Sequence, residues 1–214
     1  MNNKRARWAY CAIAMYAAFI LWTLAVRYFD IKAIGPNGPS VGLASLNQFV
    51  HCLTGVNFDL YTLTDWLGLL PICFAIGFSL LGLGQWIKRK NLFKVDRCLL
   101  VLGGFYIAVA AAYFIFEKIV INYRPILING CLEVSYPSST TVLVLCVMST
   151  AIMQLDRCIA RRSVKCFVRI LIASFMIFMV VARLLSGVHW FSDIIGGVFL
   201  SFALVMTYKA VCEH

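Results

Sequence analysis

Charged residues are scarce in this chain. Only 13% of its 214 residues are charged and 62% are hydrophobic, with a mean hydropathy of +0.88. Soluble domains contain roughly 25% charged and 45–50% apolar residues. A domain of 24.0 kDa leaves much of its surface facing its solvent, so this excess of apolar residues cannot all lie in a core. The composition therefore excludes a soluble globule and predicts that the solvent is lipid.

Two further patterns are absent. The formal net charge is +10, yet no basic run with interleaved aromatic residues lies outside the apolar segments. We therefore exclude a nucleic-acid partner and attribute the positive charge to membrane topology. The nine cysteines include no pair with zinc-ligand spacing, and most lie within apolar runs, which is typical of small apolar side chains in lipid. The sequence thus predicts neither a metal site nor a cofactor.

Stretches of low charge predict six transmembrane helices, at about residues 8–28, 66–87, 98–117, 138–155, 170–187 and 190–209. A spanning helix needs about 20 apolar residues, and the last two stretches reach this length only if Arg183 and Asp193 lie at membrane ends. The first stretch lacks a small-residue cleavage site, so we expect a retained signal-anchor helix. The sequence predicts an all-α polytopic membrane protein, with a single integral-membrane domain over residues 1–214.

The distribution of basic residues predicts the orientation. With both termini in the cytoplasm, 14 of the 19 lysines and arginines lie on the cytoplasmic side. This bias is the usual signature of a multi-pass protein of the cell membrane. The non-cytoplasmic side keeps Arg27, Lys32, Lys118, Arg124 and Arg183. Topology alone would leave this side poor in arginine, so Arg124 and Arg183 require another explanation.

The first external loop, residues 27–65, predicts a short interfacial helix. A turn-forming segment at residues 35–39 is followed by an apolar stripe with helical spacing, at Leu46, Phe49, Val50 and Leu53. The polar face of this helix carries Asn47, Gln48 and His51. We expect this face to be solvated and assign His51 no role, because a lone loop histidine is more often solvated than catalytic.

Polar residues gather at the non-cytoplasmic ends of the last four helices. His189 and Asp193 are four residues apart, so on the opening turns of a helix they would share one face. The carboxylate can then accept a hydrogen bond from one imidazole nitrogen and leave the other free as a nucleophile or base. The alternative is an aspartate stabilised by the helix dipole beside an interfacial histidine.

Other residues at this end suit an anion. The guanidinium groups of Arg124 and Arg183 match phosphate oxygens, and Pro137 precedes Ser138, Ser139 and Thr140 at a predicted helix N-terminus, where free N–H groups bind anions. The alternatives are interfacial anchoring by the arginines and ordinary helix capping by the hydroxyl groups. Taken together, the set favours a phosphoryl-transfer site that needs no metal.

These residues resemble the type 2 phosphatidic acid phosphatase superfamily, membrane lipid phosphatases related to bacterial acid phosphatases and vanadium haloperoxidases. Its pattern is Lys, six residues, Arg-Pro; then Pro-Ser-Gly-His; then Ser-Arg, five residues, His, three residues, Asp. The third part is matched here from Arg183 through His189 to Asp193, with Ala182 in place of Ser. The resemblance implies that His189 is the nucleophile that forms a phosphohistidine, that Asp193 orients it, and that Arg124, Arg183 and Ser138 bind phosphate.

The chain departs from this pattern at two positions. Glu117 stands where the family has its phosphate-binding Lys, and Lys118 lies one place nearer to Arg124, a helical rotation of about 100°. Thr140 stands where the family has the His that protonates the leaving group. Loss of a general acid typically costs ~10² to 10⁴ in rate. A diphosphate has a leaving group that needs no proton, so the sequence predicts that diphosphates are preferred. The alternative is that Glu133, Glu117 or a bound water supplies the proton and Thr140 has no bearing on substrate choice.

The resemblance implies a metal-independent phosphoric monoester or phosphoanhydride hydrolase that acts on membrane lipids at the outer face. Polyprenyl or glycerolipid phosphates and diphosphates are the expected substrates. The candidate substrate-binding residues are Lys118, Arg124, Ser138, Ser139, Thr140 and Arg183, and the candidate catalytic residues are His189 and Asp193. The alternatives are a catalytically weakened relative that binds or transports phosphorylated lipids, and a lipid phosphotransferase. No feature of the sequence indicates an oligomeric state.

Overall fold

The computed structural model describes residues 3–212 and is almost entirely helical. Its long helices are α1 (Asn3–Tyr28), α4 (Leu69–Arg89), α5 (Arg97–Lys118), α6 (Ser139–Cys158), α7 (Arg162–Leu185) and α8 (Phe191–Cys212). Its shorter elements are β1 (Lys32–Ala33), β2 (Ser40–Val41), α2 (Ala44–Thr54), α3 (Phe58–Leu67) and the 3₁₀ turn η1 (Leu92–Lys94). Among the described residues, six helical spans are long and apolar enough to cross a membrane, with α3 and α4 forming one of them. The predicted all-α polytopic architecture is confirmed.

Several helices differ in their ends from the predicted stretches. The first begins at Asn3 and the fifth covers Arg162–Leu185, because lysine and arginine are good helix formers and extend a helix beyond its apolar part. The second span begins eight residues early, at Phe58, and is interrupted at Gly68. Pro71 has no N–H to donate to the carbonyl group of Leu67, so the helical ladder breaks there.

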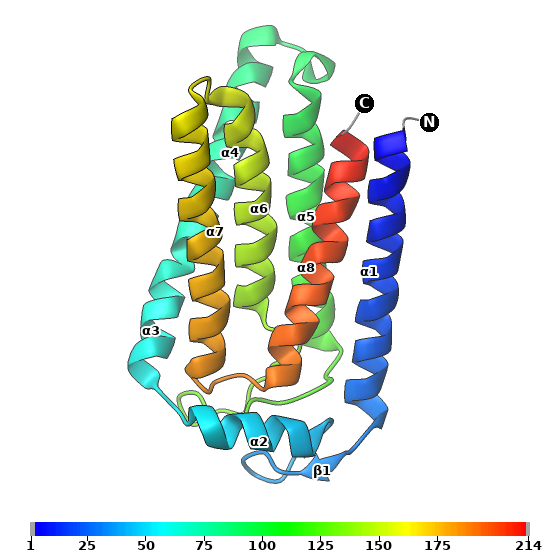
Figure 1. The fold of residues 1–214 in the computed structure, drawn as a ribbon, viewed down its shortest axis with the longest axis vertical. Helices are drawn as coiled ribbons and strands as arrows, with labels where there is room; N and C mark the ends of the chain where they lie inside the picture. The colour runs from blue at the N-terminus through cyan, green and yellow to red at the C-terminus, as the bar shows by residue number, and fades with distance from the viewer. Residues whose placement is uncertain (1–2, 213–214) are drawn as a thin grey trace.

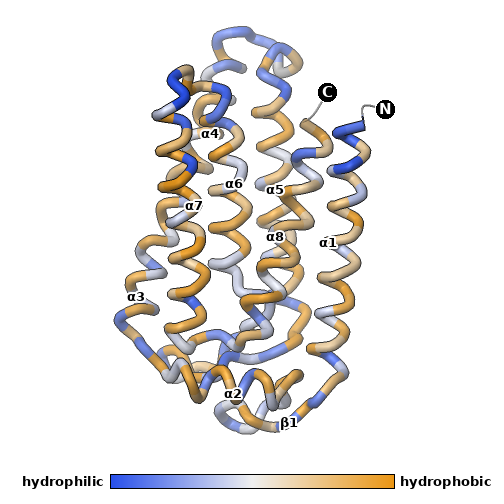
Figure 2. The backbone as a smooth tube through the Cα atoms, in the orientation of Figure 1, coloured by the Kyte–Doolittle hydropathy of each residue, from blue (hydrophilic) through white to orange (hydrophobic). Residues whose placement is uncertain are grey.

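Helices α6 and α8 form the centre of the bundle. Half or more of their spanning windows is buried, against 11–17% for the other four spans. Buried apolar side chains of α8, such as Leu200 and Tyr208, pack with Phe105 of α5 and Cys146 of α6. Large apolar side chains remain exposed on the outer helices, and hydrophilic residues gather at the two ends of the bundle (Figure 2). This distribution is typical of a protein that faces lipid around its middle.

Both termini lie at one end of the bundle, and α2 lies across the other end with the loops that precede α6 and α8 (Figure 1). The candidate site residues of those two loops are therefore at the end opposite to the termini. Gly196 of α8 allows the loop before α6 to approach closely, because a Cβ there would meet the Tyr136 ring at 2.6 Å. The Tyr136 hydroxyl group in turn lies 2.7 Å from Thr23 Oγ1, which links this loop to α1.

The prediction that the polar face of α2 is solvated is wrong for Asn47 and His51. The Asn47 amide nitrogen donates to Ser192 Oγ over 2.9 Å and its oxygen accepts from Ser192 N over 3.0 Å. His51 Nε2 lies 3.2 Å from the Gly187 carbonyl oxygen, and Phe49 and Leu53 are exposed. At a lipid boundary the apolar face of a helix can point outward, while its polar face satisfies buried backbone groups. Helix α2 thus braces the loop between α7 and α8.

Candidate active site

His189 lies in the loop between α7 and α8, not on the opening turns of the last helix as expected. The loop is held against the start of α3, where Asn57 N donates to the Ser186 carbonyl oxygen over 3.0 Å. Gly187 has φ +68°, and a Cβ there would come within 2.0 Å of the Gly55 carbonyl oxygen. Only glycine fits this close approach. The result is a fixed and almost fully buried imidazole.

Asp193 is fully buried in the first turn of α8, and its carboxylate folds back over the helix start. Oδ2 accepts from Trp190 N over 3.0 Å, and Oδ1 accepts from Asn122 Nδ2 over 3.2 Å. The same Oδ2 lies 3.8 Å from His189 Nδ1, which is longer than a hydrogen bond. Catalytic contacts of this kind are often long before a substrate binds. The carboxylate is therefore placed to orient the imidazole.

Arg124 faces the other imidazole nitrogen. Its Nη1 lies 3.4 Å from His189 Nε2 and 3.4 Å from the Val188 carbonyl oxygen, and its Nε lies 2.9 Å from Glu133 Oε2. That last pair is close but not aligned as a hydrogen bond, since Nε has no hydrogen-bond partner among the described residues. A guanidinium group only donates, so its contact with Nε2 requires that this nitrogen carry a lone pair. The contact therefore leaves Nε2 as the unprotonated nitrogen of the ring.

The surroundings of His189 keep it neutral. Burial is the main cause that lowers its pKa well below the ordinary value, and the positive charges of Arg124 and Arg183 lower it further. A neutral imidazole is the form that can attack an electrophile.

Arg183, near the end of α7, is buried and already paired. Its Nη1 donates to Asp65 Oδ1 over 2.7 Å and to Thr64 Oγ1 over 3.1 Å. Its guanidinium carbon lies 4.8 Å from the centre of the Tyr61 ring, and Nε has no hydrogen-bond partner among residues 3–212. Arg183 thus retains unused donors next to the loop of His189. Helix α3 supplies all three of its partners.

The start of α6 brings the predicted hydroxyl residues to the site. Ser138 is the N-cap residue and is fully buried; its N–H donates to the Asp193 carbonyl oxygen over 3.1 Å, and its hydroxyl oxygen accepts from Thr141 Oγ1. The Tyr136–Pro137 peptide bond before it is cis. Ser139 and Thr140 follow at the first turn, where backbone N–H groups have no partner within the helix. Such a turn is suited to bind an anion.

A cavity of about 1130 Å³ connects several of these residues. His189, Arg124, Ser139, Thr140 and Lys118 all line it. Away from this polar end it runs between α4, α5 and α6, where its lining is mostly apolar. Ser138, Arg183 and Asp193 adjoin the site but do not line the cavity. The arrangement joins an anion-binding end to a hydrophobic channel.

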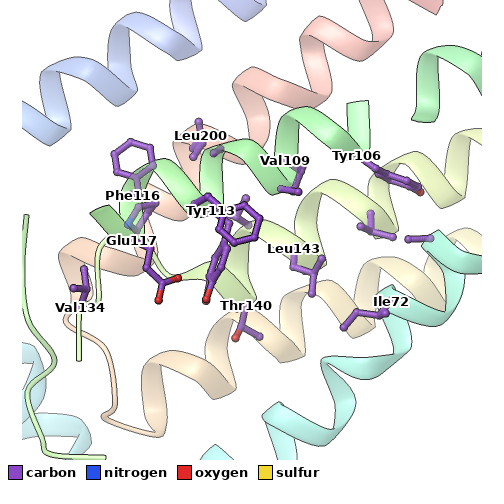
Figure 3. A pocket seen from close by; sticks show the side chains of 18 of the residues that line it. Ile72, Tyr106, Val109, Tyr113, Phe116, Glu117, Val134, Thr140, Leu143 and Leu200 are labelled. Atoms are coloured by element: carbon purple, nitrogen blue, oxygen red, sulfur yellow. The ribbon is translucent and has the colours of Figure 1, made fainter. Parts of the chain in front are cut away.

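Two acidic or hydroxyl side chains share the polar end with Thr140. Figure 3 shows Glu117 and Tyr113 of α5 directed toward Thr140 at one end of the cavity. Glu117 and Lys118 both line it, so the one-residue departure from the expected Lys position leaves Lys118 beside the same cavity.

Three residues of the site were missed by the sequence reasoning. Asn122 and Ser192 bond the Asp193 carboxylate, at 3.2 Å and 3.4 Å, and Asp65 pairs with Arg183. Asn122 is two residues from Arg124, and Ser192 is next to Asp193, so their position beside predicted site residues was the available signal. Nothing local in the sequence marks Asp65, because its partner is 118 residues away.

The fold and the site define a polytopic membrane protein with a buried histidine held between a carboxylate and an arginine at one end of a helical bundle. The model of the PAP2 superfamily matches residues 104–212, just over half of the chain. That range includes Arg124, Thr140, Arg183, His189 and Asp193. The chain belongs to the PAP2 superfamily.

One solved structure similar to the protein is the first transmembrane PAP2 type phosphatidylglycerolphosphate phosphatase from Bacillus subtilis. The two superpose with a TM-score of 0.65 over 94% of this chain and 96% of that one. Their sequences are 18% identical, so the likeness establishes a shared fold. No curated protein sequence matches the chain.

Proposed function

We propose that this protein is a lipid phosphate and diphosphate phosphatase that acts through a phosphohistidine intermediate. The observation that carries the proposal is the buried His189, whose Nε2 faces Arg124 at the polar end of an apolar cavity. Membership of the PAP2 superfamily supports the phosphatase activity, and the similar Bacillus phosphatase supports a lipid substrate.

In the proposed reaction, His189 Nε2 attacks phosphorus and the bond to the leaving group breaks. Arg124, Arg183, Lys118 and the N–H groups at the start of α6 neutralise the phosphoryl oxygens. Asp193 stabilises the imidazole cation that forms, through Nδ1. Water then attacks the phosphohistidine, releases inorganic phosphate and restores neutral His189. Protein cations supply the charge neutralisation that metal ions supply in other phosphatases, so we propose a metal-independent reaction.

Thr140 underlies the proposed preference for diphosphates, such as a polyprenyl diphosphate. Hydrolysis of a monophosphate expels an alkoxide, whose conjugate acid has a pKa near water's value of about 15.7, so it needs a proton donor. Hydrolysis of the terminal phosphate of a diphosphate expels a phosphate monoester instead. The second pKa of this leaving group is about 6, so it needs no proton donor. Thr140 cannot donate that proton at neutral pH.

The preference is tested with a matched pair, the monophosphate and diphosphate of one polyprenol. We expect a higher kcat/KM for the diphosphate, and we expect Thr140→His to narrow the gap by raising the monophosphate kcat. Equal kcat/KM values for the two substrates of the unmodified protein would contradict the leaving-group argument.

Release of phosphate by the purified protein tests the activity itself. His189→Ala should abolish turnover, whereas Asp156→Asn, a change in an ion pair with Arg169 at the opposite end of α6, should keep it. A second candidate, a weakened relative that binds or transports phosphorylated lipids, is favoured by Thr140 in the family's acid position. It predicts lipid binding without release of phosphate in the unmodified protein. A phosphotransferase would instead yield a phosphorylated acceptor alcohol.

We further propose that the site faces the non-cytoplasmic side, with both termini in the cytoplasm. The excess of basic residues at the end that carries the termini supports this orientation.

A further inference from the structure

Two cavities meet in the middle of the bundle. The outer cavity contains His189 and is lined by residues 72–80 of α4, 106–118 of α5 and 139–147 of α6. A smaller cavity of about 290 Å³ lies toward the other end, between residues 78–86 of α4 and 95–106 of the segment that includes α5. Tyr106 and Ser79 line both. These two side chains therefore form the partition between the cavities.

Tyr106 is the larger part of this partition, and it is fixed. Its hydroxyl group lies 3.3 Å from Thr150 Oγ1 of α6, and its ring centre lies 5.9 Å from that of Phe105. Thr150 donates its own hydrogen to backbone carbonyl oxygens, which leaves Tyr106 as the donor of the bond between them. Ser79 donates to the Ala75 carbonyl oxygen within its own helix, so it offers the cavity little beyond a small side chain.

The depth of Tyr106 corresponds to one leaflet of a membrane. It lies 11 residues before Glu117, which marks the polar end of the cavity (Figure 3). At about 1.5 Å per residue this separation is roughly 16 Å. The hydrocarbon core of a bilayer is about 30 Å thick, so half of it is about 15 Å. Tyr106 therefore lies near the middle of the bilayer.

The smaller cavity, called the inner cavity below, has free space because glycine lines it on both helices, Gly82 on α4 and Gly103 on α5. A Cβ added at Gly82 or Gly103 would meet no atom within 4 Å. The remaining lining is apolar and includes Leu83, Leu99 and Leu100. This space would extend the outer cavity if Tyr106 were smaller.

We propose that Tyr106 determines the length of the lipid tail that this protein accepts, because its ring closes the tail cavity at the depth of one leaflet. The inference rests on the proposed function, which places the phosphate group at His189. The occupant is the hydrocarbon tail of the same substrate, since the cavity continues from the phosphate site into an apolar channel. A tail about as long as one leaflet is thick ends at Tyr106, and a longer tail must bend away into lipid.

Tail length is tested with two prenyl diphosphates and the full-length protein in detergent. Farnesyl diphosphate has a tail of about one leaflet's depth, and geranylgeranyl diphosphate is one isoprene unit longer. The unmodified protein should have the higher kcat/KM for the farnesyl compound. Tyr106→Ala should shift the ratio of the two kcat/KM values toward the geranylgeranyl compound by about tenfold, which is the discrimination that a small change in the length of an apolar pocket gives.

Two further variants serve as controls. Tyr106→Phe keeps the ring and should keep the ratio of the unmodified protein. Gly103→Leu added to Tyr106→Ala fills the inner cavity and should restore that ratio. If Tyr106→Ala does not fold, Tyr106→Leu shortens the side chain while keeping a good helix former, and should shift the ratio in the same direction.

A ratio that is unchanged in an active Tyr106→Ala or Tyr106→Leu protein overturns the inference and leaves the proposed function intact. If neither diphosphate is hydrolysed, the proposed function fails, and tail placement is then read from photolabelling with a farnesyl analogue that carries a diazirine at the tail end. The label should attach beside Tyr106 in the unmodified protein and beside Gly103 in Tyr106→Ala. Labelling that is the same in both proteins also overturns the inference.

Discussion

Replacement of Asp193 by Asn tests the role of the buried carboxylate most directly. Both of its oxygens accept hydrogen bonds, from Trp190 N and from Asn122 Nδ2. An amide has one oxygen, so its NH₂ group must face one of these donors. Asn122 cannot rotate its own amide without losing the bond from Gly42 N to its oxygen. One of these two buried hydrogen bonds is lost in either orientation, and where Asn122 Nδ2 loses its bond it keeps only the one to Ser192 Oγ, so we expect the variant to lose about 1–3 kcal/mol of unfolding free energy.

The effect on turnover should be larger. If the NH₂ group faces Trp190 and His189, it donates to Nδ1 and favours the imidazole tautomer with a proton on Nε2, which cannot attack phosphorus. In serine proteases the corresponding change lowers kcat by about 10⁴. We therefore expect Asp193→Asn to retain a small fraction of the activity, with a decrease in kcat of about 10⁴ and a smaller change in KM.

Steady-state phosphate release and thermal unfolding of the purified variant measure the two effects separately. Asp156→Asn is a matched control, because its carboxylate pairs with the exposed Arg169 at the other end of α6, and such pairs contribute about 0–1 kcal/mol. A folded Asp193→Asn protein with nearly normal kcat would refute the orienting role of the carboxylate.

Three other predictions follow from the charges. The positive charge of Arg124 helps to lower the pKa of His189, so Arg124→Gln should raise this pKa and move the acidic limb of the kcat/KM profile to higher pH; an unmoved limb in pH-rate measurements would contradict this. A cysteine that replaces Arg162 should resist impermeant thiol reagents applied outside intact cells, whereas labelling from outside would invert the proposed orientation. Asp65 and Glu133 compete with phosphate for the two arginines, so Asp65→Asn or Glu133→Gln should lower the Ki of inorganic phosphate as a product inhibitor. A raised Ki would show that these acids assist phosphate binding.

The helices were predictable because lipid imposes a simple rule on them. Polar groups in the hydrocarbon region must be paired, so uncharged stretches such as 98–116 mark the positions of the spanning helices. The ends were less predictable, because α1 and α7 extend beyond their apolar parts through basic segments, such as Lys4 and Arg5 in α1 and Arg162 in α7, whose side chains favour a helix. The orientation of α2 could not be predicted from its amphipathic pattern, since the pattern fixes two faces and does not say which one meets lipid.

The site was partly visible because His189 and Asp193 are close in sequence, and a four-residue spacing limits how far apart they can lie. The contacts of Arg124 with His189 and of Arg183 with Asp65 depend on how the helices pack, across 65 and 118 residues. Sequence spacing therefore predicted which residue types gather at the end of the bundle opposite to the termini. Only the structure shows which hydrogen-bond donor each carboxylate contacts.

The pairing of the two arginines is consistent with the proposed entry of a dianionic phosphate into a largely buried site. Arg183 and Arg124 are buried, with 3% and 10% of their side chains exposed, whereas their acidic partners Asp65 and Glu133 are 45% and 43% exposed. A buried guanidinium without a counter-ion would be costly, so each acid stabilises its arginine while the site is empty. Because the two acids reach water, their carboxylates can be hydrated when phosphate oxygens replace them as partners of the arginines. Asp193 has no such exposure and stays bonded to the protein, which suits a group that must orient His189 throughout the reaction.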